Sequence, residues 1–327
     1  MKQMLAILAT LILTVTACSD SGTLPAADVG PDLPLLDKGG SDHQADAPAP
    51  DSAPTASRDY VVSTMLVPAT QAAVDEYGHD HDGDQKPDNA LGAILLTLST
   101  AVPGLDLQTE MMQNILNGKV VMLMRLTAQD FGDASYANLQ SWTGEETTCC
   151  ATKPCSEAEA QQSCFSGNHS FKIDSSSPQG ALLEGSISGG TIQVGPGEVE
   201  VLLPIGKYPA KVTLKQARIE ATVQTGELLD GKVSGVVTRD ELEAKVIPSV
   251  AQVLDGELND PDTKQSIKDA IKQLFDTNGD NQILAAELAD NGLIKLLLAG
   301  DVDVDKDGNK ELSAGVGFGG VTCQIVP

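Results

Sequence analysis

Hydrophobic periodicity divides the chain into segments of different type. Apolar residues recur at helical spacing in residues 91–98 and 107–116, which predicts two helices, and the apolar run 120–126 predicts a buried strand. Residues 240–258 follow helical spacing again. Helices are therefore expected on both sides of a central region whose pattern is different.

Apolar and polar residues alternate in this central region, which predicts strands with one buried face. Towards its end, the apolar positions change from the even pair Val212 and Leu214 to the odd set Ile219, Ala221 and Val223. A shift by one residue turns the opposite face of a strand toward the core. The change therefore predicts a bulge or a bend between paired strands.

Glycines punctuate the same region and predict short strands, as in a β-sandwich or an open barrel. They are Gly185, Gly189, Gly190, Gly195, Gly197, Gly226 and Gly231. The expected fold class is α+β. A β-rich body with helices occupies residues 59–259, its β-rich part lies at 165–240, and a small helical subdomain follows at 260–327. Aromatic residues make up only 3% of the chain, so aliphatic side chains must fill the core.

Residues 276–287 place oxygen-bearing side chains at the spacing that a loop needs to surround a hard cation. Calcium takes about six to eight oxygen ligands, so alternate residues of a tight turn supply one each and an acid one helical turn later supplies two. The expected ligands, at positions 1, 3, 5, 7 and 12, are Asp276, Asn278, Asp280, Gln282 through its backbone carbonyl, and Glu287.

This segment resembles an EF-hand loop, in which the apolar residue at position 8, here Ile283, joins the loop to its partner. It departs from that family at position 6, where Asn281 replaces the usual glycine. Asparagine is the next most tolerant residue in the left-handed backbone region. Helical spacing on both flanks agrees with the resemblance. The alternative is an acidic surface turn that binds no ion.

Two further loops share a second pattern, with four acids within nine residues. So many carboxylates in a short segment repel one another unless a cation or full solvation intervenes. The expected ligands are Asp80, Asp82, Asp84 and Asp88 in the first loop, and Asp303, Asp305, Asp307, Asn309 and Glu311 in the second. Both loops have glycine at position 13, Gly92 and Gly315, and neither has an acid at position 12. They resemble the short calcium repeats of thrombospondin type 3 and of related bacterial surface proteins.

The first residues resemble a bacterial lipoprotein signal. An apolar run from Leu5 ends in Val15-Thr16-Ala17-Cys18, which is similar to a lipobox. The resemblance implies a signal peptide at 1–17, acylation of Cys18 and a membrane anchor, and Ser19 implies the outer membrane or the cell surface. A run of about eleven apolar residues is too short to span a bilayer. A plain secretory signal is the alternative.

Residues 18–58 form the expected tether between anchor and body. After Cys18 the segment holds seven Asp and six Pro but no aromatic residue. Such a composition buries too little apolar area to offset the entropy of ordering, so disorder is expected. About 40 residues of flexible coil span roughly 35 Å. The body is therefore expected to stand off the membrane.

The formal net charge is −25, and it becomes −26 after signal cleavage, because Lys2 leaves and no acid does. Such a surface repels phosphate and argues against nucleic acid as a partner. It also raises the local cation concentration around the acidic loops. Solubility outside the cell is an equally good reason for part of this charge.

The cysteines besides Cys18 point to an oxidising compartment. Four of them lie within sixteen residues and predict two disulfides, at least one of them wholly inside this cluster. The adjacent pair is expected to bond to different partners, and the last cysteine is a candidate for joining the C-terminus to the cluster. One thiol is then left free, and a zinc site is the alternative. The candidates are Cys149, Cys150, Cys155, Cys164 and Cys323.

Signals for catalysis are weak, since the chain has no nucleophile elbow, phosphate-binding loop or H-E-x-x-H sequence. His79 and His81 beside the first acidic loop leave a transition-metal site open as an alternative. The expected function is a calcium-binding, lipid-anchored surface protein with Ca²⁺ as cofactor and a non-catalytic structural or interaction role. A cell-surface hydrolase, a carbohydrate-binding module with structural calcium, or a dockerin-like tail remain alternatives, with a protein or carbohydrate as partner.

Overall fold

The computed structural model describes residues 56–101, 106–178, 181–205, 208–261 and 263–327. All of these described residues belong to one compact unit. The expected signal peptide at 1–17, Cys18 and the tether up to residue 55 lie outside the described residues. Residues 56–58, which were expected to belong to the tether, are instead part of the first strand.

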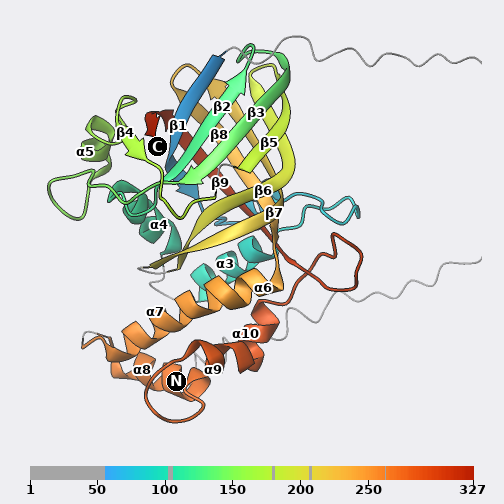
Figure 1. The fold of residues 1–327 in the computed structure, drawn as a ribbon. Coiled ribbons are helices and arrows are strands. Elements are labelled where there is room, and N and C mark those ends of the chain that lie inside the picture. Colours follow the sequence, from blue (N-terminus) through green and yellow to red (C-terminus); the bar gives the residue numbers. More distant parts are fainter. Residues whose placement is uncertain (1–55, 102–105, 179–180, 206–207, 262) are drawn as a thin grey trace, which may run out of the picture. The chain divides into compact units, whose positions relative to one another are not determined.

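Eight described strands form one antiparallel sheet that closes into a barrel, because β1 pairs with both β2 and β9 (Figure 1). Their order around the barrel is β1-β2-β3-β5-β6-β7-β8-β9. The expected α+β class with a large β-rich body is thus confirmed. The strands are β1 (Ala56–Leu66), β2 (Met122–Ala128), β3 (Ala134–Thr143), β5 (Ala181–Ser188), β6 (Thr191–Ile205), β7 (Tyr208–Gln224), β8 (Glu227–Val237) and β9 (Leu312–Thr322).

The predicted change of parity in β7 is confirmed as a bulge. Val212 and Leu214 are buried before it, and Ala217 and Ile219 are buried after it. Lys215 and Gln216 between them are both exposed, and the register of β7 against β6 and β8 shifts here. The extra residue turns the rest of the strand so that its apolar side chains face the core again.

The prediction that glycines separate short strands is only partly right. Gly189, Gly190 and Gly226 lie in turns between strands, but Gly185, Gly195, Gly197 and Gly231 lie within strands, and β6 has 15 residues. The reason at Gly185 is close approach, since a Cβ there would lie 1.9 Å from the carbonyl oxygen of Gln193. A glycine in a strand can mark crowding as well as a break.

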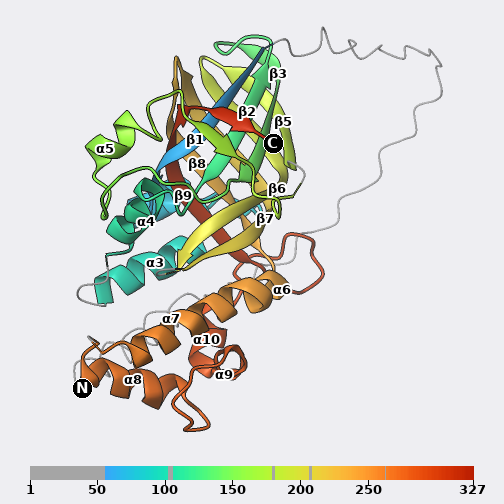
Figure 2. The ribbon, with the colours of Figure 1, turned by 60° about the vertical axis from the view of Figure 1, so that its left-hand side comes forward.

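Helices lie around the barrel and gather at one of its ends, where Figures 1 and 2 both show α6, α7, α8, α9 and α10. The predicted helices at 91–98, 107–116 and 240–258 are all present. The helical elements are α2 (Gln71–Tyr77), α3 (Ala90–Ala101), α4 (Leu107–Leu116), α5 (Glu157–Gln162), α6 (Arg239–Glu241), the π-helical turn η1 (Leu242–Val246), α7 (Ile247–Asn259), α8 (Gln265–Phe275), α9 (Ala285–Asp290) and α10 (Gly292–Leu297). Among the described residues, no helix combines the length and apolar character needed to cross a membrane.

Two apolar cores support the body. One fills the barrel and extends to the cysteine-rich loop, and the smaller one joins α7 to the helices that follow it. The smaller core contains Ile247, Ala251, Leu258, Ile271, Ile283 and Leu288. The expected C-terminal subdomain of 260–327 therefore needs correction. Its helices pack on α7, which precedes the predicted boundary, and its last part supplies barrel strand β9.

The C-terminus returns to the outside of the barrel. Strand β10 (Gln324–Val326) pairs in parallel with β4 (Ser170–Lys172), which follows the cysteine-rich loop. Cys323 lies between β9 and β10, and its N–H donates to the carbonyl of Asp59 in β1 at 3.0 Å. Backbone pairing, and not a disulfide, thus holds the C-terminus near this loop.

Candidate metal-binding loops

Three acidic loops lie at the ends of helices in the described part of the chain. Loop A (residues 80–88) joins α2 to α3, loop B (276–287) joins α8 to α9, and loop C (303–311) precedes β9. Positions are numbered from the first acid of each loop. The three loops were predicted from two different sequence patterns, but they share one hydrogen-bonding scheme.

The first carboxylate of each loop accepts a hydrogen bond from the backbone N–H at position 6. The pairs are Asp80 with Gln85 at 2.9 Å, Asp276 with Asn281 at 3.0 Å, and Asp303 with Gly308 at 3.0 Å. Each loop is thereby folded back over its first side chain. A carboxylate oxygen that accepts one N–H keeps a further lone pair with which it can bind a cation.

Backbone conformation is also shared. Positions 4 and 6 have a positive φ in every loop, although only some of these residues are glycines. The values are 86° and 71° at Gly83 and Gln85, 75° and 65° at Gly279 and Asn281, and 59° and 90° at Lys306 and Gly308. Gln85 and Lys306 adopt a region that side chains other than Gly, Asn and Asp rarely enter, so the turn geometry prevails over residue preference there.

The side chains at positions 3 and 5 turn toward the backbone in the same way, each accepting the N–H two residues later. At position 3 these acceptors are Asp82, Asn278 and Asp305, at 3.0, 2.8 and 3.2 Å. At position 5 they are Asp84, Asp280 and Asp307, at 2.8, 2.8 and 2.7 Å. The hydrogen bond from Asn309 lowers the pKa of Asp307 below its usual value, so this side chain stays ionised.

A later acid closes each loop. In loops A and C this acid is at position 9 and accepts the N–H of position 2: Asp88 from His81 at 2.7 Å, and Glu311 from Val304 at 3.4 Å. The same acids form an isolated antiparallel bridge with position 0, His79 in loop A and Val302 in loop C. Loops A and C therefore have one architecture, in agreement with their shared sequence pattern.

Loop B closes differently, through the acid at position 12. Glu287 is buried at 9% exposure. It accepts the N–H groups of Thr277 and Asn278 with one oxygen and that of Leu284 with the other, at 3.0, 3.2 and 3.0 Å. These bonds, first that from Leu284, lower the pKa of Glu287. The carboxylate is thus held ionised across the loop from Asp276.

The structure gathers some predicted ligands and not others. Within the described residues, two sets of acids have ligand atoms within 4.8 Å of one another: Asp80, Asp82 and Asp88 in loop A, and Asp303, Asp305 and Asp307 in loop C. Asp84 is not in the first set and lies 3.4 Å from Lys86 Nζ. Glu311 is not in the second. Asp276, Asp280 and Glu287 of loop B form no such set, because Glu287 faces backbone amides.

Two other predicted ligands, Gln282 and Asn309, occupy position 7. The N–H of Gln282 donates to Asp280, and the side-chain amide of Asn309 donates to Asp307 Oδ2 at 2.9 Å. Loop C also contains an orphaned polar atom, since Asp303 Oδ1 is buried without a hydrogen-bond partner. A buried carboxylate oxygen is costly unless it is compensated. The residues of loop C therefore fit a cation better than they fit solvent alone.

Loops A and C are joined by residues that the sequence analysis missed. Asn89, directly after loop A, is buried and donates through Nδ2 to the carbonyls of Val74 and Gly315, both at 3.0 Å. Its Oδ1 accepts the N–H of Gly92 at 2.9 Å, as an N-cap residue does. An Asn just before an apolar helical run is a helix-start signal that could have revealed this role.

Ser313 makes the second connection. Its Oγ accepts the N–H of Ala90 at 2.8 Å and donates to Asp301 at 2.5 Å. The glycines at position 13 complete the packing: a Cβ on Gly92 would lie 2.6 Å from Asn89 Nδ2, and one on Gly315 would lie 2.1 Å from the carbonyl oxygen of Tyr77. Gly92 thus leaves room for the Asn89 side chain that caps α3, and Gly315 lets β9 approach the end of α2.

The histidines beside loop A do not form the transition-metal alternative. Within the described residues, no set of three ligands includes His79 or His81. Their rings pack edge to face with centroids 5.1 Å apart. Burial lowers the pKa of His81 to about 4, and burial also lowers that of His79. Both rings are therefore neutral at pH 7.

Loop B is tied to the helical core. The N–H of Ile283 donates to Asp255 Oδ1 in α7 at 3.1 Å, and Ile283 is 3% exposed. Asn291 Nδ2 donates to the carbonyl of Leu274 at 2.7 Å and so links the two helices around the loop. The dockerin-like alternative expects duplicated helical loops, but loop C leads into a barrel strand.

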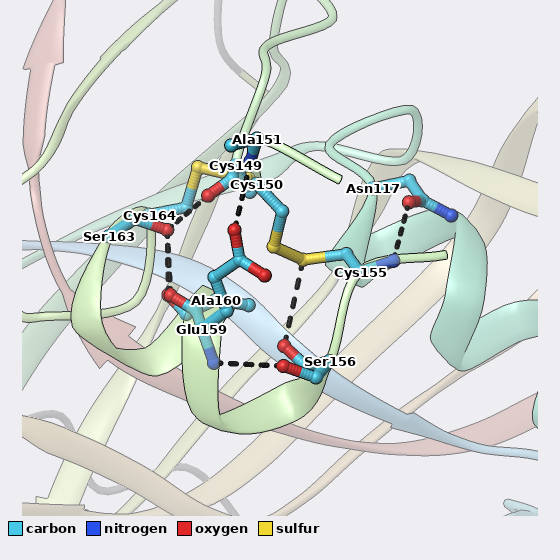
Figure 3. Close-up of a disulfide and its surroundings, with 10 residues drawn as sticks. All are labelled: Asn117, Cys149, Cys150, Ala151, Cys155, Ser156, Glu159, Ala160, Ser163 and Cys164. Atoms are coloured by element: carbon cyan, nitrogen blue, oxygen red, sulfur yellow. Dashed lines mark hydrogen bonds between the residues drawn. A yellow bond between two sulfur atoms is a disulfide. The ribbon is translucent and has the colours of Figure 1, made fainter. Parts of the chain in front are cut away.

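The cysteine-rich loop contains two disulfides, Cys149–Cys164 and Cys150–Cys155 (Figure 3). Both lie inside the predicted cluster, and the adjacent cysteines bond to different partners, as expected. The proposed link through Cys323 is wrong, since this residue is a buried free thiol. The zinc alternative falls as well, because the four clustered sulfurs are used. Asn117 Oδ1 accepts the N–H of Cys155 at 3.2 Å and attaches the loop to α4.

Comparison with known proteins adds no family to this description: no family model matches the chain, and neither the curated proteins nor the solved structures give a match. The class of protein is therefore defined by the fold and the loops, as an α+β barrel protein with three acidic loops of one hydrogen-bonding scheme.

Proposed function

We propose that this is a calcium-binding protein that is exported and lipid-anchored, with a non-catalytic structural or interaction role. The observation that carries the calcium proposal is the hydrogen-bonding scheme common to loops A, B and C. In each loop, oxygens at positions 1, 3 and 5 are held by backbone N–H groups on the inside of a tight turn. Calcium prefers such carboxylate and amide oxygens in a flexible shell.

Loops A and C are the better-supported sites, because each brings three carboxylates together. Loop B needs a movement of Glu287 before both of its oxygens can reach an ion. We therefore expect loop C to bind calcium most tightly, because Asp303 has a buried oxygen without a hydrogen-bond partner. We expect loop B to bind most weakly, because Glu287 must first break its hydrogen bonds to Thr277 and Leu284.

Calcium is expected to stabilise the body. Extracellular calcium modules bind at about 10⁻⁴ to 10⁻³ M, and at tenfold saturation each site adds about 1.4 kcal/mol to folding. Three sites would add about 4 kcal/mol, a large part of the stability of an ordinary domain. Thermal melting with calcium or chelator at fixed ionic strength tests this. Equal melting temperatures in calcium and in chelator would mean that the loops are acidic turns that bind no calcium.

The anchor proposal rests on Val15-Thr16-Ala17-Cys18. Two disulfides support export, since disulfides persist in oxidising compartments. The wild-type chain expressed in a bacterium should begin at an acylated Cys18 and partition with membranes, and Cys18→Ser should accumulate as a precursor. Intact-mass analysis that finds an unmodified Cys18 or another N-terminus would contradict the anchor and leave the calcium proposal standing.

A further inference from the structure

The end of the barrel opposite the helices carries a rigid rim. There the β5–β6 turn is hydrogen-bonded to its neighbours on both sides: Gly190 N–H donates to the carbonyl of Gly132, and Val223 N–H donates to the carbonyl of Gly190, both at 2.7 Å. Gly189 N–H donates to Asp133 at 2.8 Å. These bonds cross-link three hairpins that are distant in the sequence. A site on this rim would be formed before a ligand arrives.

A hollow of about 630 Å³ that is wide open to solvent lies at this rim. Six of its lining residues are Arg58, Gln129, Asp130, Phe131, Gln224 and Thr225. They come from β1, from the β2–β3 connection and from the β7–β8 turn. The volume lies in the range of small-molecule sites, and the mouth of a β-barrel is one of the places where such sites occur.

Arg58 is the charged centre of this cavity. Its guanidinium carbon lies 3.9 Å from the centroid of the Phe131 ring, and Nη1 donates to the carbonyl of Gln224 at 3.3 Å. No acid among the described residues forms an ion pair with it. The guanidinium is thus held over a ring at the cavity, and the carboxylate of Asp130 in the same lining does not pair with it.

Tyr60 adds a second unsatisfied group nearby. It lies two residues after Arg58 in β1, so both side chains are on the same face of the strand. Tyr60 is fully buried, and its hydroxyl has no hydrogen-bond partner. Burial raises its pKa, and the Arg58 guanidinium acts against this rise, because it lies close to the hydroxyl without reaching good hydrogen-bond geometry. The hydroxyl is therefore a neutral donor behind the guanidinium.

We propose that this barrel mouth binds a small organic carboxylate that also carries hydroxyl groups, such as a sugar acid. A guanidinium presents two parallel N–H groups that match a carboxylate, and its stacking on Phe131 fixes their direction. The side chains of Gln224 and Thr225 offer donors and acceptors for hydroxyl groups.

Asp130 selects among anions. It lines the cavity, and its Oδ1 accepts the N–H of Gly132 at 2.6 Å. This negative charge disfavours a doubly charged phosphate, while its remaining oxygen can accept a hydrogen bond from a hydroxyl. A ligand with one carboxylate and several hydroxyl groups satisfies Arg58 and Asp130 together. The inference goes beyond the calcium proposal and does not depend on it.

The test is an NMR titration of the full chain with D-galacturonate, D-galactose and inorganic phosphate, each at constant ionic strength. The proposal expects saturable shifts of the Arg58 and Phe131 signals with galacturonate only. Arg58→Gln should weaken binding about tenfold or more, because it removes a charge-assisted pair of hydrogen bonds. Arg239→Gln is the matched control, because Arg239 lies in α6 and pairs only with Glu243, and it should bind as the wild type does.

Each other result decides against the proposal. If galactose binds as well as galacturonate, the carboxylate is not recognised, and if phosphate binds equally, the site is a general anion site. Equal affinity of Arg58→Gln and wild type would place the ligand elsewhere. The melting temperature of Arg58→Gln and the NMR signals of its acidic loops should equal those of the wild type. This control shows that a loss of binding does not result from unfolding of the variant.

Discussion

The backbone N–H of Ile283 donates a hydrogen bond to Asp255 Oδ1 at 3.1 Å and so ties loop B to α7. An apolar residue at position 8 was expected to join the loop to a partner loop. Here the partner is a helix, and the side chain of Asp255 accepts the N–H that a second loop would otherwise take. Asp255 also accepts from Asn259 Nδ2 at 3.1 Å, which fixes its orientation.

Asp255→Ala should destabilise the helical part by about 1–2 kcal/mol, because it leaves the partly buried N–H of Ile283 without its acceptor. The same change should weaken calcium binding at loop B alone. Urea unfolding monitored by circular dichroism measures the first effect. Asp269→Ala is the control, since Asp269 is exposed and accepts only from Gln265; equal effects of the two variants would refute the role of Asp255.

Gly315→Ala should destabilise the body by about 1–3 kcal/mol, since the new Cβ would lie 2.1 Å from the carbonyl oxygen of Tyr77 and push β9 away from the end of α2. Thermal melting in chelator measures this packing effect without any contribution from calcium binding. Gly256→Ala in α7 is the matched control, because nothing lies within 4 Å of the added Cβ. It should be neutral or slightly stabilising, as alanine favours helix. A Gly315→Ala variant as stable as the control would show that β9 and the end of α2 are not closely packed.

Cys323 should resist alkylation at pH 8 in the folded chain and react after unfolding without reductant. It is 9% exposed, and burial raises the pKa of its thiol to about 12, so the reactive thiolate is scarce. Peptide mapping by mass spectrometry should find Cys149 linked to Cys164 and Cys150 linked to Cys155. Alkylation of any of these four before reduction would contradict the pairing.

The ion pair between Asp174 and Lys211 should give an acid-dependent part of stability. The hydrogen bond from Lys211 Nζ, at 2.6 Å, lowers the pKa of Asp174 to about 2 from an ordinary 3.8. A lowered carboxyl pKa contributes stability that is complete above the unfolded value and is lost as pH falls toward the folded value. The wild type should therefore melt above Asp174→Asn by a constant margin from pH 7 to about pH 5, with the margin shrinking below about pH 4.

Glu145→Gln serves as the control for this pH profile. Glu145 pairs with Lys172 at 2.7 Å, but the side chains are 44% and 57% exposed, against 29% and 30% for Asp174 and Lys211. The wild type should melt above Glu145→Gln by only a small margin at every pH, since exposed pairs contribute little to stability. A margin for Asp174→Asn that does not change between pH 7 and pH 3 would disprove the linkage.

Local patterns in the sequence were sufficient for some elements. The bulge of β7 follows from alternation alone, because the two consecutive exposed residues, Lys215 and Gln216, interrupt it. The loops were also predictable, since their acids are spaced by turn geometry. Their common hydrogen-bonding scheme was not predictable, because Gln85 and Lys306 take a positive φ that their residue types rarely adopt.

The closing strand β9 could not be predicted from periodicity. Nearly all of Leu312–Thr322 is buried on both faces, because α2 and α3 cover its outer side, so no alternation marks it. The strand also contains four glycines, which are typical of turns and add nothing to an alternating pattern. Its partners β1 and β8 are distant in the sequence. The contacts of Asn89 and Ser313 were missed for the same reason, since they join the start of α3 to β9, and only the helix-capping role of Asn89 has a local signal.

Native mass spectrometry of the mature chain titrated with calcium tests the central claim most directly. The account predicts three bound ions at millimolar calcium, and the loss of one ion in each of the variants Asp80→Asn, Asp276→Asn and Asp303→Asn, because each removes a position-1 carboxylate. The variant with all three changes measures how much calcium attaches to the chain outside the three loops. A wild-type chain that retains no more calcium than this triple variant would contradict the proposal that these loops bind calcium.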